Sequence, residues 1–270
     1  MAAPPDKDAV IVEVISDAAD FPEAFACISE AFGRQVHDAI WTAFNPGWDT
    51  AAGRAAGAAR LAERWAATAK AHDGGDPHTI FLKATLPDPD PDPDRNPSAG
   101  APSGERRVIA GMAIWVQETA VAGHGNLSVA DATASMDLEA LYPGDEREQR
   151  FLRQVSRSLF RQRLEFIAAR AAAAAAADGS PAVMALDLCA TRPAFQRRGV
   201  ASAMVRWGLD EARRRGVPWA ATEASSMGRH AYRRLGFEPR GPETVYEVDD
   251  EFRDRELPSN LFMVYSTGSE

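Results

Sequence analysis

The chain has 270 residues, of which 45% are apolar, and this is enough for one large domain or two small ones. The net charge of −9 argues against a general nucleic-acid binder, which usually has a basic surface. No stretch reaches the roughly 18 consecutive apolar residues of a membrane helix, and no basic region followed by an apolar core opens the sequence. We therefore expect a cytoplasmic protein, monomeric or homodimeric, that binds neither membrane nor nucleic acid.

Cysteine and histidine usage gives no sign of a metal site. Cys27 and Cys189 both lie in apolar surroundings, so we expect buried free thiols rather than a disulfide. The five histidines are scattered, and no Cys/His cluster has the spacing of metal ligands. No metal is therefore expected.

The first half of the chain alternates short β-branched runs with amphipathic stretches. This pattern predicts strands and helices over residues 10–15 (strand), 20–36 (helix), 50–71 (helix), 79–84 (strand) and 107–116 (strand). Four Pro-Asp repeats follow the second strand, and every second residue there lacks an amide proton. We expect an extended, flexible loop over residues 87–105, with the strands on either side of it forming an antiparallel hairpin.

A long segment, residues 117–180, separates this hairpin from the next strand. Its first part is irregular, and residues 145–177 have a helical pattern that ends in a run of alanine, a strong helix former. The segment is either a lid over a substrate pocket or a solvated helix with little function.

The last third of the chain has the most regular pattern. Strands are expected over residues 182–190, 217–222, 245–248 and 261–265, and helices over 199–215 and 226–235. Strand–helix–strand–helix–strand after a hairpin-rich first half indicates an α/β fold, with a mixed central sheet of about six to seven strands and flanking helices.

One motif carries the chemistry. The strand ending at Ala190 is followed by Gln196-Arg197-Arg198-Gly199-Val200-Ala201, which opens a helix. A helix N-terminus has amides without intrahelical partners and a partial positive charge, so such a turn can cradle a pyrophosphate. Gly199 lets a ligand approach the backbone, and the two arginines add charge for phosphate.

The spacing Gln196-x-x-Gly199-x-Ala201 resembles the [Q/R]-x-x-G-x-[G/A] acetyl-CoA motif of the GNAT superfamily of acetyltransferases. The helix ending in Tyr232-Arg-Arg-Leu-Gly-Phe237 resembles the family's second signature. The resemblance is close over about residues 182–240 and rests on element order alone over 8–116. The inserted segment and Glu223-Ala-Ser225 are similar to fungal or actinobacterial members. The implied architecture is a single GNAT domain over residues 1–270, with splayed strands at the acetyl-CoA site.

The resemblance implies a role for each matching position. The backbone of the strand before the motif would pair with the pantetheine arm, the amides of the motif would hold the pyrophosphate, and Tyr232 would face the thioester sulfur. The implied acetyl-CoA residues are Leu188, Cys189, Ala190, Thr191, Gln196, Arg197, Arg198, Gly199, Val200, Ala201, Ser202, Ser225 and Tyr232. Ser225 stands where many members have asparagine, which is a departure from the pattern.

Acetyl transfer to an amine is helped by a base and an acid, and a relay of backbone carbonyls and water is the alternative to a dedicated base. A lysine-like amine has a pKa of about 10.4 and must be neutral to attack, so a base is useful. Glu223, at a strand end, and Asp187, in an otherwise apolar strand, are the candidates, and a structural ion pair is the alternative for each. Tyr232 is the candidate acid for the departing thiolate, and a core tyrosine is the alternative.

The sequence therefore predicts an acetyl-CoA-dependent N-acetyltransferase that acetylates a primary amine of a small molecule by direct attack in a ternary complex. A protein lysine or N-terminal acetyltransferase, or a CoA-binding module without turnover, are the alternatives. The expected acceptor-binding parts, about residues 20–72 and 117–180, have no recognisable motif.

Overall fold

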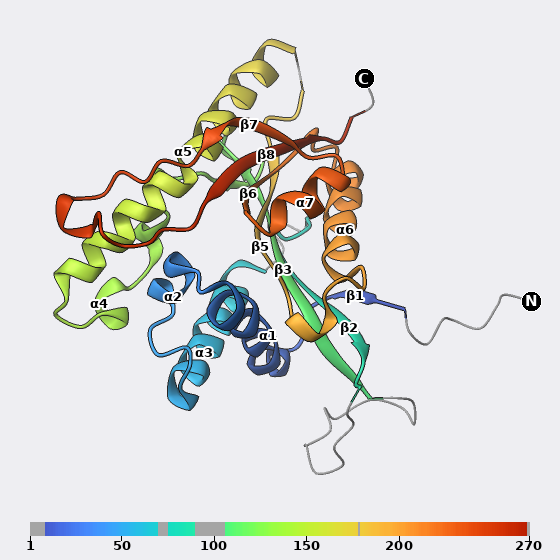
Figure 1. The fold of residues 1–270 in the computed structure, drawn as a ribbon. Coiled ribbons are helices and arrows are strands. Elements are labelled where there is room, and N and C mark those ends of the chain that lie inside the picture. The colour runs from blue at the N-terminus through green and yellow to red at the C-terminus, as the bar shows by residue number, and fades with distance from the viewer. Residues whose placement is uncertain (1–8, 70–74, 90–105, 178, 269–270) are drawn as a thin grey trace, which may run out of the picture.

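An eight-stranded sheet forms the centre of the computed structural model, which describes residues 9–69, 75–89, 106–177 and 179–268 (Figure 1). The strand order is β1-β2-β3-β5-β6-β8-β7, and β4 pairs with the end of β3. Neighbours are antiparallel except β5–β6 and β3–β4. The strands are β1 (Ile11–Val14), β2 (Thr79–Pro87), β3 (Arg107–Thr119), β4 (Asn126–Leu127), β5 (Val183–Thr191), β6 (Trp219–Ser225), β7 (Glu238–Glu243) and β8 (Asn260–Ser266).

Helices cover both faces of this sheet (Figure 1). One face, here called the α5 face, carries α1 (Phe21–Ile28), α3 (Ala51–Thr68) and the long α5 (Glu146–Ala177), with α2 (Ala39–Phe44) packed against α5. A π-helical segment, Ser29–Val36, continues α1, and the short α4 (Leu138–Leu141) precedes α5. The opposite face, here called the α6 face, carries α6 (Val200–Arg214) and α7 (Gly228–Arg234).

Alternation along β3 explains how one strand serves both layers. Met112 and Ile114 pack with α1 on the α5 face, whereas Ala113 and Trp115 join the core under α6. Gly208 of α6 lies directly over the Trp115 ring, since a Cβ there would come within 2.0 Å of it. The missing side chain therefore lets α6 approach the sheet closely.

A β-bulge in β5 interrupts the alternation of its side chains between the two faces of the sheet at Asp187. Ile114 pairs with Leu188 and Trp115 with Leu186, so Asp187 is an extra residue between them. Leu186 packs on the α6 face, but Leu188 packs on the α5 face. The bulge places Asp187 on the same face as Leu188, where it meets arginines from α3 and α5.

Most of the predicted elements are confirmed. The α/β fold with a mixed sheet is correct, although the sheet has eight strands rather than six to seven. The expected helix over 145–177 is α5, and both cysteines are free. The predicted flexible loop over 87–105 lies mostly outside the described residues. None of the helices in the described residues has the length and apolarity needed to span a bilayer.

The predicted strand over residues 245–248 is wrong. On the side of β8 that faces away from β6, the pairing strand is β7. β7 contains two prolines and a glycine, which are tolerated because it lies at the sheet edge. Tyr246 and Val248 pack instead against the core between α2 and α5. The backbone amide of Glu247 donates to Ser158 Oγ at 3.0 Å, so this segment bonds to α5 and not to the sheet.

Candidate active site

Strands β5 and β6 separate after two paired positions. Met184 pairs with Ala220 and Ala185 with Ala221, and no further pairs join the two strands. The last link is a hydrogen bond of 3.1 Å from Thr222 Oγ1 to the carbonyl of Leu186. β5 remains paired with β3 as far as Thr191, and β6 with β8 as far as Ser225. The strands therefore splay apart beyond these pairs, and the β6-facing backbone edge of residues 188–191 has no strand partner. We call the divergence of the two strands the opening.

The turn after β5 leads to an uncapped helix. Gly199 is the N-cap of α6 at φ +85°, a conformation that favours glycine, and no side chain caps the first amides. Arg197 also has positive φ, and Arg197, Arg198 and Gly199 are all exposed. A Cβ on Gly199 would meet nothing within 4 Å, so its backbone conformation, rather than crowding within the chain, requires glycine. Uncapped amides at a helix N-terminus carry a partial positive charge and are suited to an anion.

Gln196 ties this turn to the opposite face. Its amide nitrogen donates to Gln35 Oε1 at 2.7 Å, and Gln35 Nε2 donates to Gln196 Oε1 at 3.1 Å. A third bond, at 3.3 Å, runs from Gln196 Nε2 to the carbonyl of Thr191. The glutamine of the motif therefore fixes the turn against the π-helical segment.

Tyr232 of α7 lies beside the opening on the α6 face. It is 8% exposed, and its hydroxyl interacts with the thiol of Cys189 and with Thr222, one residue from each splayed strand. Burial, with the neighbouring Cys189, raises the pKa of Tyr232 well above its usual value, so the phenol stays protonated. Burial also raises the pKa of Cys189 to about 12, and a thiol in this state is a poor nucleophile.

Ser225, at the end of β6, has a local partner. Its Oγ accepts a hydrogen bond of 3.2 Å from the amide of Gly228, the first residue of α7. The serine thus orders the turn that presents Tyr232.

A cluster of charged side chains lies at the same level on the α5 face. Asp187 and Glu223 each follow the last paired residue of their strand by two positions, and both contact Arg163 of α5. Arg163 is 3% exposed; its Nε donates to Glu223 Oε1 at 3.0 Å, its Nη2 donates to Glu223 Oε2, and its Nη1 donates to Asp187 Oδ1 at 3.2 Å. Glu118 of β3 is 3.5 Å from the same Nη1, and Arg64 of α3 donates to Asp187 at 2.7 Å. We call these five residues the charge cluster.

The three carboxylates of the charge cluster have different acidities. Burial raises the pKa of Glu118 to about 7, opposed by Arg163 and reinforced by Asp187 and Glu223. Partial burial acts on Asp187 in the same direction, but Arg64 and Arg163 together lower its pKa to about 2. Burial raises the pKa of Glu223, against the attraction of Arg163. Arg163 itself stays charged, because its pKa is raised further by the carboxylates that face it.

The structure thus brings the predicted residues together at one opening, on two faces of the sheet. Tyr232 and the motif lie on the α6 face, and Asp187 and Glu223 lie on the α5 face. Sequence reasoning missed Arg163 and Glu118. The sequence contained a sign of each, a charged residue at a position expected to be buried. Arg163 falls on the apolar stripe of α5 between Val155 and Phe166, and Glu118, by strand alternation, points to the same face of β3 as Ile114.

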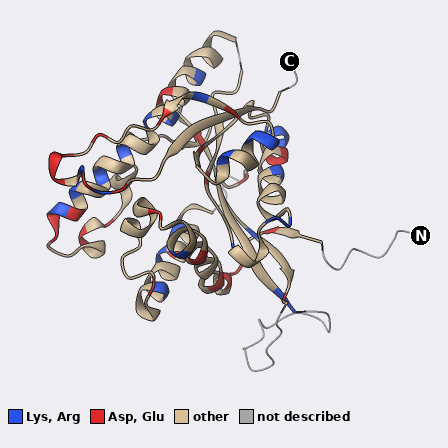
Figure 2. Cartoon of the chain, in the orientation of Figure 1, with Lys and Arg blue, Asp and Glu red and all other residues tan. Residues whose placement is uncertain are grey.

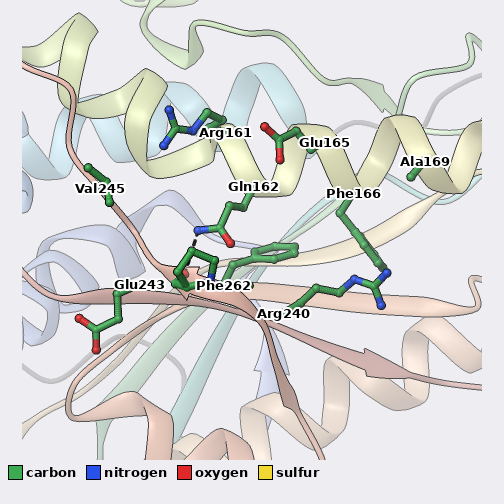
Figure 3. A pocket seen from close by; sticks show the side chains of 11 residues that line it. Arg161, Gln162, Glu165, Phe166, Ala169, Arg240, Glu243, Val245 and Phe262 are labelled. Carbon is green, nitrogen blue, oxygen red and sulfur yellow. Dashed lines mark hydrogen bonds between the residues drawn. The ribbon is translucent and has the colours of Figure 1, made fainter.

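A separate groove of about 440 Å³ lies between α5 and the edge of the sheet (Figure 3). Phe166 and Phe262 form its apolar lining, and Gln162 bridges it by donating to the carbonyl of Pro242 at 3.1 Å. Glu165 lines the groove and is exposed to solvent. None of the predicted site residues lines this groove. Within the described residues, no group of three or more His, Cys, Asp or Glu side chains could hold a metal ion.

Comparison with known proteins agrees with the motif. Residues 85–237, more than half of the chain, match the acetyltransferase (GNAT) family. The chain belongs to the GNAT acetyltransferase family. No curated protein matches the sequence.

Several solved structures of acetyltransferases are similar to this chain. The histone acetyltransferase HPA2 and related acetyltransferase of Corynebacterium glutamicum is 20% identical, with 94% of each chain covered and a TM-score of 0.45. A mosquito arylalkylamine N-acetyltransferase like 5b is 11% identical, with 96% of this chain and 100% of that chain covered and a TM-score of 0.49. The ribosomal-protein-S18-alanine N-acetyltransferase of Escherichia coli is 10% identical over 97% and 96%, with a TM-score of 0.42.

GNAT acetyltransferases generally use acetyl-CoA. The residues present fit this molecule in two ways. The free first amides of α6, beside exposed Arg197 and Arg198, suit a pyrophosphate, and the unpaired edge of β5 offers backbone groups to an extended amide chain.

Proposed function

We propose that this chain is an acetyl-CoA-dependent N-acetyltransferase that acetylates a primary amine of a small molecule in a ternary complex. One observation carries the proposal: the opening between β5 and β6 has an uncapped helix N-terminus, suited to an anion, on one face and partly buried carboxylates on the other. An anionic donor and a cationic acceptor would therefore enter from opposite sides of the sheet and meet at the splay.

On the α6 face, the chain's own backbone would hold the donor. Acetyl-CoA, when bound, supplies an acetyl group activated as a thioester. The backbone of Leu188–Thr191 would pair with its pantetheine arm, and the amides of Arg197–Ser202 would bind its pyrophosphate. The protonated Tyr232, between Cys189 and Thr222, would give a proton to the sulfur that leaves.

On the α5 face, the charge cluster would attract the acceptor. Three carboxylates face two arginines, so one negative charge is left over when all are ionised. A protonated primary amine would balance this charge. Asp187 and Glu223 lie level with the splay and would orient the nitrogen; they are the two bases that the sequence predicted.

The closure of the α5 face favours a small acceptor over a folded protein. Ile40 of α2 packs with Phe151 and Val155 of α5 and with Phe252. Tyr142, just before α5, donates to the carbonyl of Ala43 at 2.8 Å. These contacts join the N-terminal helices to the inserted segment on the side from which an acceptor would arrive, and this leaves less room for a polypeptide.

Two measurements test the proposal in sequence. Acetyl-CoA at 100 times its dissociation constant should stabilise the fold by about 2.7 kcal/mol, seen as a higher melting temperature. Release of CoA thiol should then be measured with a panel of small amines and with lysine and N-terminal peptides. Absence of stabilisation would overturn the donor assignment. Faster release with peptides than with any amine would replace the small acceptor by a protein, and stabilisation without thiol release would indicate a binding module.

A further inference from the structure

The three carboxylates of the charge cluster differ in how firmly they are held. Both oxygens of Glu223 are bonded to Arg163, through Nε and Nη2. Asp187 has one oxygen on Arg163 and the other on Arg64. Within the described residues the carboxylate of Glu118 has a single hydrogen-bonding contact, at 3.5 Å to Arg163, which is at the limit of a hydrogen bond. Glu118 is therefore the carboxylate with an oxygen to spare.

We propose that Glu118 takes up the proton that the acceptor ammonium must lose. Arg163 is the positioning residue, because it engages the oxygens of Asp187 and Glu223 and leaves Glu118 as the carboxylate that can accept a proton. The proposal rests on the proposed function and adds two residues to it. Asp187 and Glu223 then act as fixed negative charges that draw in the ammonium, rather than as the base.

The geometry connects Glu118 to the splay. Asp187 is level with the opening, and its Oδ1 and the Oε1 of Glu118 contact the same guanidinium nitrogen. Because the two carboxylates share this nitrogen, an ammonium that enters beside Asp187 would also come close to Glu118. The side chain of Glu118 is 19% exposed, enough for water to reach it and carry the proton away.

The charges around the three carboxylates also favour Glu118 as the one that accepts a proton. The charged groups that face Glu118 are Arg163 from α5, Asp187 from β5 and Glu223 from β6, with Arg64 from α3 behind Asp187. Protonating Asp187, whose pKa is about 2, would discard two ion pairs, and protonating Glu223 would break its two-point bond to Arg163. Glu118, with a pKa of about 7, changes charge near neutral pH, where a base is most effective.

The proton transfer balances. The N–H bond of the ammonium breaks and its electron pair stays on nitrogen, giving a neutral amine, while the proton forms an O–H bond on Glu118. No oxidant or further reactant is needed. After turnover Glu118 returns the proton to solvent. One proton is thus released for every protonated amine that is acetylated.

The arginine that makes this possible comes from the inserted segment. Arg163 lies in the middle of α5, and neighbouring Phe166 and Ile167 fasten the helix to Val183, Ala221 and Phe262 of the sheet. Ion pairs with the segment after β7 hold the other end of α5, including Arg150–Asp249 at 3.0 Å. The segment would therefore complete the active site, in addition to any role as a cover.

The test is the pH dependence of kcat/KM, with the full chain and its best amine, between pH 5.5 and 9.5. The wild type should lose activity below a midpoint near pH 7, as Glu118 becomes protonated. Glu118→Gln should lower kcat/KM about 100-fold at pH 8 and remove this midpoint, with the dissociation constant for acetyl-CoA unchanged. Glu118→Asp should restore part of the activity and the midpoint.

Two further variants separate chemistry from folding. Glu165→Gln removes an exposed carboxylate from the same face of the sheet and should leave the profile as in the wild type. Arg163→Lys keeps the charge but not the forked bonds, and should move the midpoint of the kcat/KM profile to higher pH. If Arg163 were purely structural, the same variant would lower the yield of folded protein and leave this midpoint unchanged. A Glu118→Gln enzyme with the wild-type profile would overturn this proposal alone. A wild type without amine-dependent thiol release would overturn the proposed function, and this proposal with it.

Discussion

The two faces of the sheet are built in opposite ways. The α6 face of the site comes from one continuous stretch, β5 to α7, and its charged groups, Arg197 and Arg198, are exposed. The charge cluster on the α5 face comes from α3, β3, α5, β5 and β6, and its central Arg163 is buried. Acidic and basic residues intermingle along α5 and the segment after β7 (Figure 2). One face can thus be recognised from local sequence, and the other only from the fold.

The largest effect is expected at Tyr232 on the α6 face. Tyr232→Phe keeps the ring but removes the hydroxyl, with its contacts to Cys189 and Thr222. If that hydroxyl is the proton donor, kcat should fall by about 10²–10⁴-fold while acetyl-CoA affinity stays the same. Thiol-release kinetics and a binding titration measure the two quantities. An unchanged kcat would make Tyr232 a core residue and remove it from the mechanism.

The next effect belongs to the α6 face alone. Gly199→Val places a branched side chain at φ +85°, a strain of about 1–3 kcal/mol, and should weaken acetyl-CoA binding by roughly 10- to 100-fold. Gly216→Val is a matched control, because Gly216 has φ +65° and equally open surroundings at the other end of α6. Equal loss of binding in both variants would show that general destabilisation, and not the turn, is responsible.

A smaller effect concerns the stability of the α5 face. The folded state holds the Glu118 proton more tightly than the unfolded state, since its pKa rises from 4.5 to about 7. The unfolded state releases this proton first, so this group's stabilising contribution is full below pH 4.5 and is lost as pH rises to about 7. Glu118→Gln should therefore melt higher relative to the wild type at pH 8 than at pH 5, by about 2–4 °C for each kcal/mol. A difference independent of pH would contradict the raised pKa.

The smallest effect is expected at Arg64, whose side chain is 43% exposed. Arg64→Gln removes one positive charge from the cluster, which should raise the pKa of Asp187. The same loss of positive charge, acting at longer range on Glu118, should move the midpoint of the activity profile upward by a few tenths of a pH unit. Stability should change by less than about 1 kcal/mol, as for other exposed ion pairs. A large loss of stability would mean that this pair, and not the burial of Arg163, holds the cluster together.

The difference between the two faces, one built from a continuous stretch and the other from five separate elements, decides how much of the site the sequence could predict. The strands and helices from β5 to α7 and the Gln196–Ala201 turn follow from local periodicity and a glycine at its expected place. β7 was missed because Pro239 and Pro242 argue against a strand, and only its position at the edge permits them. Asp187 was singled out as a carboxylate in an apolar strand and Glu223 as a carboxylate at a strand end, but their partner lies on a helix in the inserted segment. No local pattern specifies that pairing.

The length of that inserted segment has a consequence for how such an enzyme can diversify. Strands β3 and β5 are antiparallel neighbours, so a short turn would suffice to join them, yet residues 120–182 lie between them. The entropy lost in closing a loop grows only with the logarithm of its length, by about 0.6 kcal/mol for each doubling. The sheet therefore tolerates a segment of almost any length at this connection. New acceptor specificities could arise here by exchange of one inserted helix, while the Gln196–Ala201 turn, where we propose that the donor binds, stays unchanged.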